Sequence, residues 1–269
     1  MTRTSGWMLA GALLMAATLS TMLTGCKPSI AIRKGAVVDG GQKTESAPLN
    51  PATLGTVSGT IHLEGKAPER IKIDMSQDPA CAMSGNADNY SEQYVAHDGK
   101  LANVYLYIKV GPTAAFTAAG PANPIPVIMD QKGCRYTPHV IAVYKGGSVE
   151  FRNSDATMHN VHIMPATVGG KQLDVSQAPK GQPQVVPFND AAIMEPVRCN
   201  NHPWMNAFIN VADTPFYAIS GPDGHFEIQG LPAGRYELAA VHEKLGEQTM
   251  SVTVKPQETV TADFKYTAK

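Results

Sequence analysis

The sequence lacks an excess of either charge and carries few charged residues overall. Lysine and arginine total 22 against 23 aspartate and glutamate, so the formal net charge is −1, and charged residues make up 17% of the 269 residues. Without a basic excess the chain has no electrostatic attraction for a phosphate backbone, so we expect no nucleic-acid binding. Cysteine is scarce, at four residues, and histidine numbers eight, so each can be assessed at its own position.

Long helical patterns are also missing. After the N-terminal region no long run places apolar residues at the i, i+3, i+4, i+7 spacing of a helix. Short runs with alternating apolar and polar residues are frequent instead, and the 24 glycines and 20 prolines supply the turns between them. This pattern predicts an all-β protein built from β-sandwiches, whereas residues 76–94 are irregular and predict no element. The alternating runs are residues 57–64, 104–110, 149–151, 226–238, 250–254 and 260–264.

Residues 1–25 have the pattern of an export signal. One charge, Arg3, precedes an apolar run from Trp7 to about Leu19. A short positive start, an apolar core and small residues before the cleavage point are typical of a secretory signal. The Leu-Thr-Gly-Cys motif ending at Cys26 resembles the bacterial lipobox, which implies cleavage before Cys26 and acylation of its sulfur. An uncleaved membrane anchor is the alternative, although a spanning helix needs about 20 apolar residues.

The lipobox resemblance also predicts where the protein acts. Residues 26–54 contain few residues that could form a core, so we expect a flexible tether. The protein would be exported and lipid-anchored, with no other membrane contact. Lys27, rather than an aspartate, after Cys26 resembles the pattern for the periplasmic face of the outer membrane, or the cell surface. Export places the remaining thiols in an oxidising compartment, where a disulfide persists.

A thiolate, an imidazole and a thioether occur together in one Cys-x2-His-x2-Met motif, formed by Cys199, His202 and Met205. Soft sulfur and imidazole select copper over hard cations, and two His, one Cys and a weak axial Met are the ligands of blue-copper electron-transfer sites. The second His must come from elsewhere, and His159 and His162 lie upstream. Positions three apart on a strand face opposite ways, so only one of them can face the site. We expect His159, because it directly follows a turn.

These segments together resemble the cupredoxin family, with a short ligand loop like that of amicyanin rather than the longer loop of plastocyanin. The resemblance covers about residues 125–212, a third of the chain, and includes a Val-Glu-Phe-Arg-Asn strand and the His-Asn-Val run at 159–161. It implies a Greek-key β-sandwich over residues 121–212 with one type 1 copper. The implied ligands are His159, Cys199, His202 and Met205.

The same resemblance implies roles for neighbours of the ligands. Asn160 matches the residue whose hydrogen bonds connect the two ligand loops. His202, followed by Pro203 and Trp204, would lie near an apolar surface patch and pass electrons, although Trp204 could equally pack in the core.

Other interpretations of the motif stay open. Cys199 could be half of a disulfide and Met205 a core residue. Zinc is a second alternative, but a thioether is a poor zinc ligand. A multicopper oxidase is not expected, because the chain has no His-x-His pair for a multinuclear centre.

The two other cysteines, Cys81 and Cys134, are most simply a disulfide in an exported protein. By closing the loop between them, this disulfide would stabilise the fold by roughly 4 kcal/mol in the chain-entropy model. The alternative is a second metal or redox site that uses Cys134 and His139.

The C-terminal region resembles a second family. An Asp-Gly hairpin turn at 223–224 and the Leu-Pro-x-Gly-x-Tyr run at 231–236 are similar to carboxypeptidase regulatory-like, transthyretin-like sandwiches. Residues 213–269 are too few for a complete sandwich of this kind, and residues 55–120 supply strands that resemble its start. We therefore expect a transthyretin-like sandwich split by an inserted cupredoxin. A plain tandem of modules is the alternative.

These features predict a copper protein that carries one electron between redox partner proteins and is not an enzyme. The first alternative is copper storage, delivery or resistance. The second is a surface-interaction protein in which copper is incidental. Softer Cu(I) contacts for the copper-handling alternative could come from Met129, Met158, Met164 and Met194, although scattered Met more often fill cores.

Overall fold

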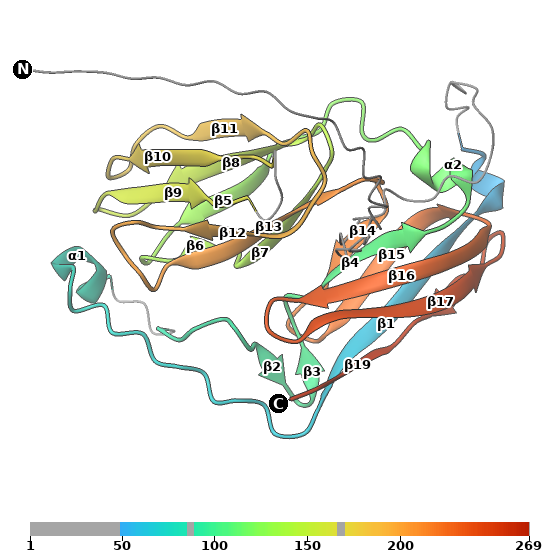
Figure 1. The fold of residues 1–269 in the computed structure, drawn as a ribbon, viewed down its shortest axis with the longest axis horizontal. Coiled ribbons are helices and arrows are strands. Elements are labelled where there is room, and N and C mark those ends of the chain that lie inside the picture. The colour runs from blue at the N-terminus through green and yellow to red at the C-terminus, as the bar shows by residue number, and fades with distance from the viewer. Residues whose placement is uncertain (1–48, 85–88, 166–169, 269) are drawn as a thin grey trace, which may run out of the picture. The chain divides into compact units, whose positions relative to one another are not determined.

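The fold was analysed in a computed structural model, which describes residues 49–84, 89–165 and 170–268. Its regular elements are nearly all β-strands arranged in several sheets (Figure 1), which confirms the predicted all-β class. Within these ranges no helix has the length and apolarity needed to cross a membrane. The helical pieces are η1 (Pro51–Thr53), α1 (Pro79–Ala82) and α2 (Thr113–Phe116). Cys26 and the predicted signal lie outside the described residues.

Two sheets enclose one hydrophobic core and form what we call the first sandwich. In its strand β1 every second residue is buried, so the period-two pattern of the sequence faces the core as expected. One sheet contains β1 (Leu54–Glu64), β2 (Ala96–His97), β3 (Lys100–Leu101), β15 (His225–Pro232), β18 (Thr259–Thr261) and β19 (Phe264–Thr267). The other contains β4 (Tyr105–Val110), β14 (Tyr217–Ile219), β16 (Gly234–His242) and β17 (Gly246–Val254).

The first sandwich joins strands that are far apart in the sequence. β1 pairs antiparallel with β15 and parallel with β18 and β19, while β4 pairs with β14 and β16. The backbones approach closely, since a Cβ at Gly59 would lie 2.0 Å from the carbonyl oxygen of Ala262. Strands from both sides of residues 127–212 therefore share one core. We interpret 127–212 as a unit inserted between the two halves.

Residues 127–212 form the second sandwich around a separate core. Parallel pairs, β5 with β8 and β7 with β13, accompany the antiparallel ones. One sheet contains β7 (Val140–Tyr144), β9 (His159–Ile163), β10 (Leu173–Gln177), β12 (Ala192–Arg198) and β13 (Asn206–Ala212). The other contains β5 (Val127–Gln131), β6 (Tyr136–Thr137), β8 (Ser148–Asn153) and β11 (Gln184–Pro187).

One segment departs from the expected domain boundaries. Those boundaries placed all of residues 55–120 with the first sandwich, but Met75 and Cys81 are buried in the core of the second. The physical reason is a disulfide between Cys81 and Cys134, which holds the connection between β1 and β2 against the second sandwich. The irregular residues 76–94 therefore include the one-turn helix α1 beside the predicted metal ligands.

Candidate metal centre

The predicted ligands come from the start of β9 and from the loop between β12 and β13. His159 is the first residue of β9, and the loop runs from Cys199 to Met205. The hairpin register pairs Arg198 with Asn206, so the chain must turn within seven residues. Two backbone hydrogen bonds close that turn, from Cys199 N to Met205 O at 3.3 Å and from Met205 N to His202 O at 2.9 Å. The loop is thus held in one conformation by its own backbone.

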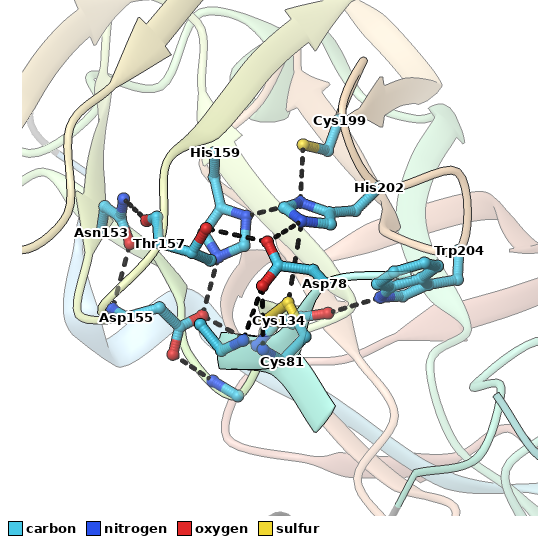
Figure 2. Close-up of a disulfide and its surroundings, with 12 residues drawn as sticks. Asp78, Cys81, Cys134, Asn153, Asp155, Thr157, His159, Cys199, His202 and Trp204 are labelled. Carbon is cyan, nitrogen blue, oxygen red and sulfur yellow. Dashed lines mark hydrogen bonds and ion pairs between the residues drawn. A yellow bond between two sulfur atoms is a disulfide. The ribbon is translucent and has the colours of Figure 1, made fainter. Parts of the chain in front are cut away.

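Three of the predicted donor atoms converge. The Nδ1 atoms of His159 and His202 lie 2.9 Å apart, and Cys199 Sγ lies 3.5 Å from His202 Nδ1. All three side chains are buried, and Figure 2 shows the two rings and the thiol facing one another. Met205, at the end of the loop, is also buried in the core of the second sandwich. The fold therefore brings together side chains that are up to 43 positions apart in the sequence, the separation of His159 and His202.

The contacts between the donors set the protonation states of the metal-free site. Burial raises the pKa of Cys199, but hydrogen bonds from His159, from the backbone of Asn160 and Asn201 and from His202 outweigh it and lower the pKa to about 6. Burial lowers the pKa of His159, but Asp155 and Cys199 outweigh it and raise the pKa to about 9. Near neutral pH the metal-free site therefore holds a thiolate, which is the form that binds metal, beside a protonated His159 that must release its proton when a metal binds.

This donor set fits copper. A thiolate and two imidazoles lie within 4.8 Å of one another, and the water-poor environment suits soft ligands. The thioether of Met205 at the same loop argues against zinc, for which a thioether is a poor ligand. Because Cys199 is a free thiol in the structure, the alternative in which it forms a disulfide is wrong.

Asn160 links the two ligand segments. Its backbone N–H donates to Cys199 Sγ at 3.3 Å, and its side-chain oxygen accepts from Asn200 N at 3.4 Å. Its side-chain amide donates to Asp174 at 2.8 Å and to the carbonyl of Val175 at 3.1 Å. The residue predicted to tie the loops therefore lies between them and bonds to both.

His162 faces away from the donors. Its Nδ1 lies 2.9 Å from the side-chain oxygen of Asn200, at the edge of the loop, and the side chain is half-buried. The alternation of side chains along β9 accounts for this, because His159 and His162 are three positions apart.

Two carboxylates that the sequence did not single out contact the outer nitrogens of the ligand rings. Asp155 Oδ2 lies 2.9 Å from His159 Nε2, and Asp78 Oδ2 lies 3.0 Å from His202 Nε2 (Figure 2). Asp155, four residues before His159, could have been found from its place in the turn. Asp78 is 124 positions from His202, and no local pattern connects them.

The carboxylates are held in their charged form. Hydrogen bonds lower the pKa of Asp78 to about 2 against the effect of burial. The bond with His202 has the largest effect, and Thr157 and two backbone N–H groups add to it. Burial also acts to raise the pKa of Asp155, but hydrogen bonds from His159, Cys134 and Gly133 keep it below its usual value. Each ligand ring therefore has an anionic partner on its outer edge.

The side chain of His202, which the resemblance placed near an apolar surface patch, is covered by neighbouring side chains. Its side chain is only 4% exposed, because Asp78 and Cys81 cover it, with Cys81 Sγ 3.7 Å from His202 Nε2. Trp204 packs beside the His202 ring, with centroids 5.1 Å apart, and donates from Nε1 to the carbonyl of Cys134 at 3.1 Å.

The alternative second site at Cys134 and His139 is not formed. Cys134 is bonded to Cys81, and His139 Nε2 lies 2.6 Å from a carboxylate oxygen of Glu243. The other ring nitrogen of His139 lies 3.2 Å from the carbonyl of Asn206. Both nitrogens are therefore engaged away from the sulfur.

Comparison with solved structures finds similarity to copper proteins. An amicyanin mutant in its oxidized state is 24% identical over 32% of this chain and 81% of its own, with a TM-score of 0.29. The Cu(I) form of an amicyanin variant is 20% identical over 40% of this chain and 98% of its own, with a TM-score of 0.29. A copper-containing nitrite reductase from Thermus scotoductus is 23% identical, with a TM-score of 0.31, and the match takes in 35% of this chain and 24% of the reductase.

The similarity is limited to a cupredoxin-like part of the chain, and its TM-scores are low. No family model matches the chain. A search of curated proteins finds no match. The assignment of a metal to this site therefore rests on the donor atoms described above.

Proposed function

We propose that the protein binds one copper ion at His159, Cys199, His202 and Met205 and carries single electrons between redox partner proteins. The observation that carries this proposal is the convergence of two imidazole Nδ1 atoms and one thiolate at a buried point. When bound, copper supplies one-electron exchange between Cu(I) and Cu(II).

The residues of the chain supply rigidity and exclude water. The hydrogen bond from Asn160 N holds the Cys199 thiolate, and Asp155 and Asp78 hold the two rings at their outer nitrogens. Burial of the donors removes water that would rearrange when the charge of the metal changes. A site whose donors stay in place in both oxidation states needs little reorganisation, which favours electron transfer over release of the ion.

Copper delivery is the second candidate function, and one observation favours it. A surface cavity of about 320 Å³ is lined by Asp78, Met158 and His202 among other residues, and Met158 is 49% exposed. An exposed thioether beside a ligand could pass Cu(I) to a partner. Of the other Met residues considered for this role, Met129 is fully buried in the core.

Replacing Met205 with leucine separates the two functions. If Met205 is a weak axial ligand, the variant should keep copper and its blue colour. The reduction potential should rise, because Cu(II) loses a donor and gains an apolar neighbour. We expect about a 10-fold shift in the Cu(II)/Cu(I) affinity ratio, which corresponds to about 59 mV for one electron. Voltammetry measures the potential, and transfer of Cu(I) to a chelator measures copper loss.

The matched control is Met194→Leu, because Met194 is partly buried on β12 but outside the donor set. It should leave both measurements unchanged. Rapid loss of Cu(I) from the wild-type protein, without reversible voltammetry, would overturn the electron-carrier proposal and favour delivery.

We also propose that the protein is a lipoprotein anchored through Cys26, facing the periplasm or the cell surface. The support is the Leu-Thr-Gly-Cys motif behind an apolar run. Wild-type protein should fractionate with membranes, since the several acyl chains of a lipoprotein anchor it stably where one would not. Cys26→Ala should block processing and lipidation. Recovery of wild type as a soluble, unlipidated chain, shown by mass spectrometry, would contradict the proposal.

A further inference from the structure

The Asp78 side chain makes contacts with both of its carboxylate oxygens. Oδ1 accepts hydrogen bonds from the backbone of Ala80 at 2.7 Å and Cys81 at 3.3 Å and so caps α1. Oδ2 accepts from the Thr157 hydroxyl at 2.9 Å and lies 3.0 Å from His202 Nε2. A carboxylate held at both oxygens has one orientation, and that orientation places an anion on the outer edge of a predicted copper ligand.

The disulfide connects this carboxylate with the one on the other ligand ring. Cys81 lies three residues after Asp78 and is bonded to Cys134. The backbone N–H of Cys134 donates to Asp155 Oδ2 at 2.8 Å, and that of Gly133 donates to Asp155 Oδ1 at 2.7 Å. Figure 2 shows the disulfide next to both aspartates, on the side of the rings away from Cys199.

The geometry of His202 determines what the carboxylate can do. A metal held by Nδ1 leaves the ring proton on Nε2, which then donates to Asp78. Such a bond fixes the ring and raises the basicity of the ligand nitrogen. A more basic ligand and a nearby anion stabilise Cu(II) more than Cu(I), because the divalent ion carries the larger charge.

We propose that Asp78, although it precedes the second sandwich in the sequence, is a positioning residue for His202 that holds the ring and lowers the reduction potential of the bound copper. The proposal rests on the proposed copper centre. Asp155 does the same locally for His159, whereas Asp78 reaches His202 from a distant segment that the Cys81–Cys134 disulfide holds against the site.

The test is Asp78→Asn. Asparagine caps a helix as well as aspartate does, so the contact with Ala80 and Cys81 is kept. The variant removes the charge and places an amide donor against the His202 N–H and the Thr157 hydroxyl. We expect the Cu(II)/Cu(I) affinity ratio to fall about 10-fold, so the potential should rise by about 59 mV. The matched control is Asp74→Asn, because Asp74 accepts hydrogen bonds from Ser76, away from His202, and is exposed.

A second readout uses the metal-free protein. The proton on His202 Nε2 should give a slowly exchanging ring N–H signal in the NMR spectrum of wild type and of Asp74→Asn. The signal should be lost or exchange much faster in Asp78→Asn. Asp78→Ser should behave like Asp78→Asn, since serine keeps the cap but is too short to reach His202.

Equal potentials in Asp78→Asn, Asp78→Ser and wild type would overturn the proposal. An unchanged His202 N–H signal in both variants would overturn it as well. A wild type that binds no copper overturns the proposed function instead. In that case the ring N–H measurement alone decides whether Asp78 positions His202.

Discussion

Cys199→Ser should abolish the intense blue absorption of the Cu(II)-loaded protein, because that absorption arises from charge transfer between a thiolate and copper. The buried Cys199 Sγ lies 3.5 Å from His202 Nδ1 and accepts a hydrogen bond from Asn160. Cys199 is the one free cysteine among the described residues, so no other thiol there can replace it. Serine is nearly the same size, so the fold should be kept. The visible spectrum of the loaded variant, beside its circular dichroism, measures this.

The two histidines of β9 test the same ligand set, one as a predicted ligand and the other as its matched control. His159→Ala should also lose the colour, because His159 Nδ1 is 2.9 Å from His202 Nδ1. His162→Ala should stay blue, because His162 bonds to Asn200 at the edge of the loop. A blue Cys199→Ser protein, or a colourless His162→Ala protein with a normal fold, would contradict the ligand assignment.

Among the substitutions proposed, removal of the disulfide should lower the free energy of unfolding the most. The Cys81–Cys134 bond closes a loop with a sequence separation of 53. Opening a loop of that length costs about 4 kcal/mol in the chain-entropy model. The double variant Cys81→Ala, Cys134→Ala should therefore unfold at a lower urea concentration. Equilibrium unfolding of the metal-free proteins measures the difference.

A reductant supplies the control for this experiment. Adding dithiothreitol should destabilise wild type to a similar degree and leave the double variant unchanged. The same double variant should raise the reduction potential in the direction of Asp78→Asn, because α1 would no longer be held beside His202. A double variant as stable as wild type would show that the cross-link does not hold the segment in place.

The parts of this protein that the sequence determined are those encoded over short stretches. Alternation along a strand separates buried from exposed positions, as in β1, and it also separates His159 from His162. The Cys-x2-His-x2-Met motif lies in one seven-residue loop, so chain connectivity alone keeps Cys199, His202 and Met205 near one another. Local geometry was enough to predict the all-β class and a candidate ligand set.

Only the tertiary structure decided the contacts between distant segments. The burial of Met75 and Cys81 in the second core and the placement of Asp78 on His202 join residues that no local pattern connects. Such contacts form when a whole core closes and a cross-link holds a loop, so they depend on the sum of many burial energies. The cupredoxin resemblance implied that His202 lies near an apolar surface patch, whereas the folded chain covers this residue with a carboxylate and a disulfide.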